Sequence, residues 1–141
     1  MKEPVQMSLF NQPTLNIADD FKEAMALAVK NSGLSREQVV EKMNGLAARY
    51  GIRLAKGNGK NLNISTLEKW LNLNSPGRMI SVKALNVFCA VVGDNTPIDI
   101  MVRPLGAKVI GEKDIKKLAW ADASLKAKKA RRKIRELEAE L

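Results

Sequence analysis

The chain of 141 residues contains no histidine and a single cysteine. The absence of histidine excludes Ser-His-Asp and Cys-His catalysis and the HExxH zinc site. Cys89 lies in the apolar run VFCAVV, where no neighbour in the sequence would lower its pKa, so we expect a buried structural thiol rather than a nucleophile. The acidic residues do not show metal-ligand spacing either. The sequence therefore predicts a protein that is not an enzyme and holds no cofactor.

Long apolar runs and aromatic residues are also scarce. No stretch approaches the length that spans a membrane, and the N-terminal MKEPVQMSLFNQ lacks the apolar region of a signal peptide. Aromatic residues make up 4% of the chain, so the core must be mostly aliphatic. We expect a soluble protein of the reducing cytoplasm, with no membrane partner.

The net charge of +9 is unevenly distributed along the chain. Residues 1–50 are balanced, with six basic and six acidic groups. Residues 51–75 hold four basic groups against one acidic, and residues 126–141 hold seven against three. Such basic surfaces favour nucleic acid through counterion release, or an anionic membrane surface through attraction. A merely solvated surface is the alternative that charge alone leaves open.

Capping signals mark the first two predicted helices. A stripe of apolar residues predicts a helix over about 19–31, which Gly33 ends in the left-handed conformation. Ser35 and Gln38 fit the capping box of a second helix, which could continue to Tyr50.

The stretch NLNISTLEKWLNLN, residues 61–74, predicts a third helix. Its cap is either Asn63 or Ser65, two alternatives that differ by half a turn. Its apolar residues fall at helical spacing and are expected to face inward: Leu67, Trp70 and Leu71.

Two further short helices follow. The fourth has Ser81 as its N-cap and Gly93 after its end. The fifth begins with Thr96 as its cap and stops near Arg103, because Pro104 disfavours continuation.

The remaining segments complete an all-α prediction. Residues 1–18 are expected to form a flexible arm, and residues 19–104 a helical domain. Residues 105–112 form either a short strand or an extended linker. Residues 113–141 contain no glycine or proline and are expected to form one long basic helix.

Three segments resemble the Cro and λ-repressor (Xre) type of helix-turn-helix protein. LSREQVVEKMN resembles the family's second helix, LNISTLEKWLN its recognition helix, and SVKALNVFCAVVGD the helix that closes its small bundle. The resemblance covers about residues 19–103 and implies a λ-repressor-like five-helix bundle. It implies a sequence-specific regulator whose third helix, residues 63–72, reads the major groove of double-stranded DNA. A weaker similarity to small regulatory proteins of Mu-like prophages implies a phage or prophage transcriptional regulator.

The sequence departs from the family between the second and third helices. The usual tight turn is replaced by some seventeen residues, roughly Gly45 to Asn61. Asn44 stands where the family has a turn glycine, and Val40 where it has a small alanine. The resemblance thus implies an enlarged connection between the two helices.

The resemblance also implies which residues touch DNA. Asn63 takes the cap position, and Arg36 the position of a residue that contacts the DNA backbone. Apart from the resemblance, the three positive charges of residues 51–60 in the enlarged connection, with no acidic residue among them, predict that these basic residues contact the DNA backbone. The complete set of candidate DNA-binding residues is Arg36, Arg53, Lys56, Lys60, Asn63, Ile64, Ser65, Thr66, Glu68 and Lys69.

The C-terminal helix carries an apolar seam sustained for three heptads. The seam consists of Trp120, Ala123, Ala127, Ala130, Ile134, Leu137 and Leu141. It predicts a homodimer through this helix, and an antiparallel pairing would set the basic block near the acidic end of the other copy. Two alternatives remain open. Leu118 and Trp120 could pack back on the bundle, with the tail beyond Lys126 a solvated helix or an arm that contacts the DNA backbone. The chain could also be a non-enzymatic assembly or adaptor protein that acts through this helix.

Overall fold

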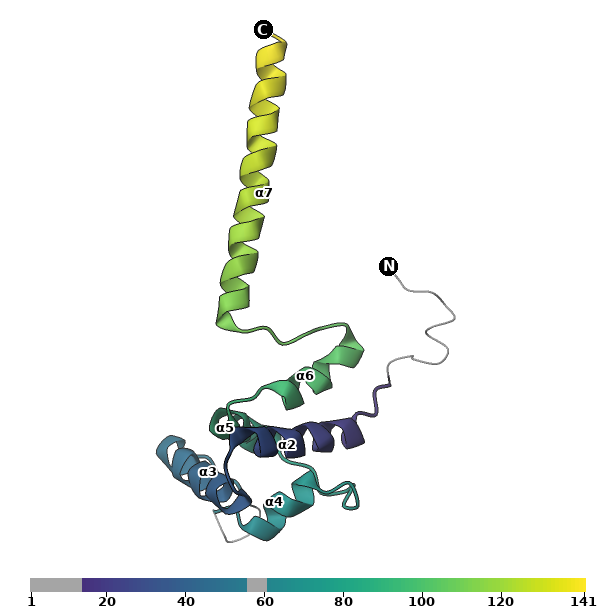
Figure 1. Cartoon of the computed structure of the whole chain (residues 1–141), viewed down its shortest axis with the longest axis vertical. Coiled ribbons are helices and arrows are strands. Elements are labelled where there is room, and N and C mark those ends of the chain that lie inside the picture. The colour runs from purple at the N-terminus through teal and green to yellow at the C-terminus, as the bar shows by residue number, and fades with distance from the viewer. Residues whose placement is uncertain (1–13, 56–60) are drawn as a thin grey trace. The chain divides into compact units, whose positions relative to one another are not determined.

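The computed structural model describes residues 14–55 and 61–141 of the chain. Every element in these residues is a helix, and the predicted all-α class is confirmed for them. The elements are α2 (Ala18–Ser32), α3 (Arg36–Tyr50), α4 (Ile64–Leu71), α5 (Val82–Val92), α6 (Thr96–Val102), the 3-10 helix η1 (Arg103–Leu105) and α7 (Glu112–Ala139) (Figure 1). Most of the predicted N-terminal arm lies outside the described residues.

The chain divides into two compact units. The first ends at Val109 and contains α2 to α6 and η1. The second runs from Ile110 to Leu141 and consists of α7 with a short lead. No side chain of α7 is buried, and Trp120 is 73% exposed.

Local signals set the ends of the first helices as predicted. Gly33 closes α2 with a φ of 77°, in the left-handed region. The Ser35 hydroxyl accepts the Gln38 N–H at 3.1 Å, and the Gln38 side chain accepts the Ser35 N–H at 2.9 Å. Both halves of the expected capping box are therefore formed at the start of α3.

The predicted caps of the next helices are confirmed in one case and wrong in the other. The Ser81 hydroxyl accepts the Ala84 N–H at 3.2 Å and caps α5 as predicted. Thr96, however, is the first residue of α6, and Asn95 is the N-cap. The Thr96 hydroxyl and N–H both donate to the Asp94 carboxylate, at 2.6 and 2.9 Å, so Thr96 is held by the preceding turn.

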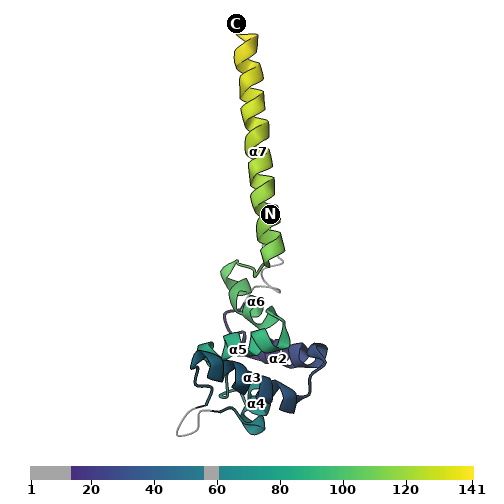
Figure 2. The same cartoon turned by 90° about the vertical axis from the view of Figure 1, so that its left-hand side faces the viewer.

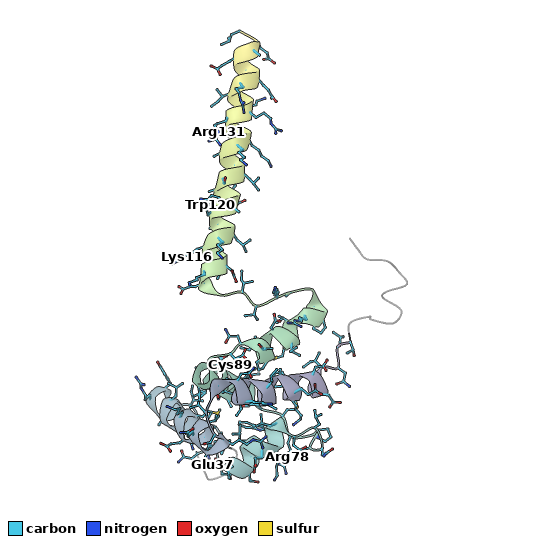
Figure 3. The ribbon with its side chains drawn as sticks, viewed as in Figure 1. Glu37, Arg78, Cys89, Lys116, Trp120 and Arg131 are labelled. Carbon is cyan, nitrogen blue, oxygen red and sulfur yellow. The ribbon has the colours of Figure 1, made fainter. Side chains whose placement is uncertain are left out.

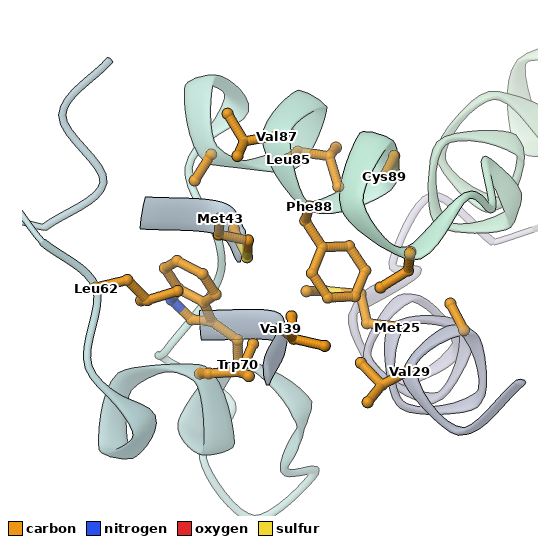
Figure 4. Close-up of a cluster of buried hydrophobic side chains, with 14 of the residues drawn as sticks. Met25, Val29, Val39, Met43, Leu62, Trp70, Leu85, Val87, Phe88 and Cys89 are labelled. Carbon is orange, nitrogen blue, oxygen red and sulfur yellow. The ribbon is translucent and has the colours of Figure 1, made fainter. Parts of the chain in front are cut away.

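The core of the first unit lies among α2, α3, α4 and α5 (Figures 1 and 2). The α2 helix packs on α4, α5 and α6, while α3 packs on α4 and α5. Phe88 is fully buried and points toward Met25, and Trp70 lies beside Leu62 (Figure 4). Cutting back a side chain of the size of Phe88 costs about 3–5 kcal/mol. This core fixes one side of α4.

The α3 helix is longer than the family resemblance implied. The resemblance placed the start of the enlarged connection near Gly45, but α3 continues to Tyr50, as the helix pattern allowed, and ends at Gly51, whose φ is 65°. The connection to α4 therefore comprises residues 51–63, and part of the extra length is helical. Leu54 and Leu62 are buried, so the described ends of this connection are attached to the core.

The segment after α6 is held by one carboxylate. Asp99 accepts the Val109 N–H at 2.9 Å and the Arg103 Nε–H at 2.6 Å. The Val109 N–H and then Arg103 lower the pKa of Asp99, while burial opposes them. No strand forms in the described chain, so the strand alternative for residues 105–112 is wrong.

Candidate nucleic-acid interface

The α4 helix has one buried and one exposed side. Leu67, Trp70 and Leu71 are buried, as their spacing predicted. Ser65 and Lys69 are exposed on the opposite side. A short helix with this division can present polar groups to a ligand without disturbing its packing.

The start of α4 settles which residue caps it. The Asn63 carbonyl oxygen Oδ1 accepts the Thr66 N–H at 2.8 Å, so Asn63 is the N-cap and Ser65 is not. Ile64 was expected to face outward, but it is only half-exposed. The reason is helical geometry: Ile64 precedes the buried Leu71 by seven residues, which brings both to nearly the same side of the helix.

The end of α4 is held by a buried lysine of α2. The Lys22 ammonium donates to the carbonyl oxygens of Lys69 at 2.8 Å, Trp70 at 3.1 Å and Arg78 at 2.6 Å. The last carbonyls of a helix lack intrahelical partners, and a cation there also meets the negative end of the helix dipole. Burial lowers the pKa of Lys22, and the nearby Asp19 carboxylate opposes that effect. Lys22 thus joins α2, the last turn of α4 and the connection that follows it.

The residue before the cap of α4 is held by α3. The Asn44 side chain accepts the Leu62 N–H at 2.7 Å and donates to the Leu62 carbonyl at 2.9 Å. This two-bond pairing resembles the exchange between neighbouring strands and fixes Leu62 in place. Asn44 therefore has a different role from the turn glycine whose position it takes in the family resemblance.

Two candidate residues meet at the exposed side of α4. The Arg36 guanidinium, at the start of α3, lies 3.4 Å from the Glu68 carboxylate, and both side chains are about half-exposed. An exposed pair of this kind adds less than about 1 kcal/mol to stability. Its effect is electrostatic, because Arg36 offsets the one acidic group on the exposed side of α4. A shallow hollow beside the pair is lined by Leu71, Asn72, Leu73 and Asn74.

The other candidates lie in several places. Ser65 and Lys69 are exposed beside Glu68, and Thr66 is half-buried. Arg53 is exposed and donates to the Ala55 carbonyl at 3.3 Å. Lys56 and Lys60 lie outside the described residues, and their expected DNA contacts stay predictions.

Two residues that position α4 were missed in the sequence, Lys22 and Asn44. For Lys22 a signal was available. It precedes Met25 by three residues and Val29 by seven, so it lies on the apolar side of its helix. A lysine at such a position needs a buried set of acceptors, although the sequence does not say which.

No family model, no curated protein and no solved structure matches the chain. Within residues 14–55 and 61–141, no cluster of acidic or cysteine side chains is arranged to bind a metal ion. None of the helices described here has both the length and the apolar character needed to cross a membrane.

Proposed function

We propose that the protein is a sequence-specific, non-enzymatic double-stranded DNA-binding protein that acts in the cytoplasm as a phage or prophage transcriptional regulator. In this proposal α3 and α4 are a helix-turn-helix of the Cro and λ-repressor type, and α4 enters the major groove. The observation that carries the proposal is the two-sided α4. Its buried side is fixed by Leu67 and Trp70, while Ser65 and Lys69 are exposed beside Arg36.

Both ends of α4 are held in the way a reading helix requires. Asn44 fixes Leu62 before the cap, and Lys22 fixes the carbonyls of the last turn. Groups that recognise a ligand act best when rigid elements hold them close to the productive geometry. This rigidity supports a role of α4 in recognition rather than a merely solvated surface.

The exposed side chains suit base edges and phosphates. The Ser65 hydroxyl can donate or accept, and therefore suits several base edges. The Glu68 carboxylate can accept from a cytosine amino group, and the Lys69 ammonium can contact a phosphate or guanine. Arg36 lies next to Glu68 and can bind the DNA backbone while it offsets that acidic charge.

Selection of bound sequences from a random duplex pool, with the full chain, tests the proposal. On the selected site, Lys69→Ala should weaken binding and lower the salt slope by about one unit, while Ser65→Ala should alter base preference. Lys83→Ala and Asn86→Ala are the matched controls, because both residues are exposed on α5. Unchanged affinity of both α4 variants, or no enriched sequence, would refute the proposal.

The proposed regulator is a homodimer that pairs through α7. The observation in its favour is that the seam residues remain exposed, with Ile134 56% and Leu137 50% accessible. An antiparallel pairing centred on Ile134 would place Ala130 against Leu137 and Ala127 against Leu141 of the second copy. Small residues then face large ones, so the helices keep an even separation, whereas a parallel pairing would face alanine with alanine.

Most charges beside the seam favour the same arrangement, although Lys133 would face Lys133 of the second copy. In the antiparallel pairing, Arg131 lies near Glu138 of the second copy, and Lys126 near its Glu140. Opposite charges at such flanking positions select partner and orientation. Sedimentation of the full chain, compared with a chain ending at Leu125, tests the dimer. A full-length monomer at tens of micromolar would exclude it.

An adaptor protein that acts through α7 is the second candidate function. It is favoured by the exposure of Leu118 at 61% and of Trp120 at 73%, more apolar surface than a monomeric helix needs. A salt titration of duplex binding separates the two functions. The regulator should bind one sequence preferentially and lose affinity steeply with salt, and the adaptor should show no sequence preference.

A further inference from the structure

Seven basic residues crowd a short part of α7: Lys126, Lys128, Lys129, Arg131, Arg132, Lys133 and Arg135. All are exposed, and Figure 3 shows Arg131 projecting from the helix. At about 1.5 Å per residue, the block carries roughly one positive charge per 2 Å of helix. Duplex DNA carries roughly one negative charge per 1.7 Å of its axis. The block therefore matches a duplex in charge density.

Most of this charge has no acidic partner. Among the described residues, the one ion pair that involves the block joins Lys126 to Asp122 at 3.1 Å. Like charges instead lie one helical turn apart, as in Lys128 with Arg132 and Arg131 with Arg135. Each such pair destabilises a helix by about 0.2–0.5 kcal/mol. An anion bound along the block would remove this repulsion.

The basic groups also occupy a definite side of the helix. At about 100° per residue, the side opposite the apolar seam is formed by four of them. We call this set the outer basic face: Lys128, Lys129, Arg132 and Arg135. A second copy paired along the seam would leave this face uncovered, so dimerisation and anion binding are compatible.

We infer that the outer basic face of α7 is a second DNA contact, which binds the phosphate backbone without regard to sequence. It would extend the contact that α4 makes, and in this respect it depends on the function proposed above. An anionic membrane surface suits the outer basic face less well than duplex DNA does. Beside the basic block, residues 126–135, the seam contains Ala127, Ala130 and Ile134, whereas a helix that lies on lipid needs several bulky apolar side chains there.

The test compares two triple variants of the full chain. Lys128→Gln/Lys129→Gln/Arg132→Gln removes three charges from the outer basic face. Lys113→Gln/Lys116→Gln/Lys117→Gln removes three charges from the start of the same helix and is the matched control. Glutamine keeps a helix propensity close to that of lysine and arginine, so both variants should fold. Circular dichroism of both variants checks this.

The affinity for a duplex of scrambled sequence is then measured against salt concentration. In the Lys128→Gln/Lys129→Gln/Arg132→Gln variant, the plot of log K against log salt should become shallower by about 2.7 units. The reason is that each lost phosphate contact removes about 0.9 from the magnitude of its slope. It should fall by less than one unit in the control. Equal changes in the two triples would overturn the inference, because they would mark a general effect of net charge. An unchanged slope in the first triple would overturn it as well.

Two further measurements separate the possible failures. If the pool selection enriches no sequence but the first triple still lowers the slope, the proposed regulator fails and the outer basic face stands. If a sequence is enriched and the slope is unaffected, α4 stands and the outer basic face fails. Binding of both triple variants to vesicles of phosphatidylserine and phosphatidylcholine is measured as well. Vesicle binding that the first triple abolishes, with its DNA slope unchanged, would assign the face to membranes instead.

Discussion

The Lys22 ammonium lies 2.8 Å from the carbonyl oxygen of Lys69, so a buried cation of α2 closes the helix whose outer side carries the Lys69 side chain. The backbone and the side chain of Lys69 therefore lie in different surroundings: its carbonyl is bound by Lys22, and its side chain is exposed. The Trp70 and Arg78 carbonyls share the same cation. Folding of the first unit and the placement of α4 are therefore coupled through one side chain.

Replacing Lys22 by methionine should lower the free energy of unfolding by about 2–3 kcal/mol. The methionine fills the space, but it leaves the bound carbonyls without their donor in a buried place. Urea unfolding followed by circular dichroism measures the change. Lys30→Met is the control, because Lys30 is exposed on the same helix. Equal stability of the two variants would show that the Lys22 hydrogen bonds are not needed.

The Asn44→Ala variant should lose about 1–2 kcal/mol of stability, because the Leu62 N–H and carbonyl lose their partners. A looser start of α4 should also weaken binding to the selected site more than binding to a scrambled duplex. Asn86→Ala, at an exposed position of α5, is the control. If the two affinities fall in the same proportion, Asn44 supports the fold but not recognition.

Asp99 should make the stability of the first unit depend on acidic pH. Its pKa is lowered from 3.8 in the folded chain, chiefly by the Val109 N–H. The contribution of the carboxylate is therefore complete above about pH 4 and is lost as the pH falls through the folded pKa. The free energy of unfolding should differ less between neutral and acidic pH in Asp99→Asn than in the wild type. An equal difference in the two chains would assign the acid dependence to other groups.

Cys89 should be unreactive in the native chain. Burial, with a smaller contribution from Asp94, raises the pKa of the thiol to about 11. At pH 8 a thiol-specific reagent should therefore label Cys89 only as fast as the first unit opens. Immediate labelling of the folded chain would contradict this.

The same pKa predicts an alkaline effect on stability. Because the folded pKa lies above the ordinary value of 9.0, the unfolded chain loses its proton first. Stability should fall as the pH rises from 9 towards 11, and Cys89→Ala should reduce that fall. Chemical unfolding of the wild type and of Cys89→Ala at pH 8 and pH 10.5 measures the free energy of unfolding of each. An equal fall in the variant would assign the alkaline loss to other groups.

The parts of the fold that the sequence predicts are the local ones. The capping box of Ser35 and Gln38 and the left-handed Gly33 act within a few residues of each other, so their pattern in the sequence is enough. The inward spacing of Leu67 and Trp70 is likewise a property of one helix. These predictions are confirmed, because nothing distant competes with them.

The pairings that position α4 could not be predicted in this way. Lys22 is separated from Lys69 by 47 residues, and Asn44 from Leu62 by 18. Which acceptors a lysine finds depends on how the helices pack, and no pattern within one helix carries that information. The family resemblance also misled at Asn44, because it implied a turn where α3 continues. The DNA contacts of Ser65 and Lys69 stay predictions for a different reason, because their proposed partner is not part of the chain.

The Asn44–Leu62 pairing separates the length of the connection from the placement of α4. The two residues are joined across the base of the segment between them, and the core holds Leu62 at its exit. The α3 helix continues six residues beyond Asn44 to Tyr50, so Leu62 is held from within a helix and not through the chain that directly precedes α4. A shift of α3 on the core should therefore move the start of α4 with it. The placement of α4 is inherited from α3 and is not measured out along the chain between them.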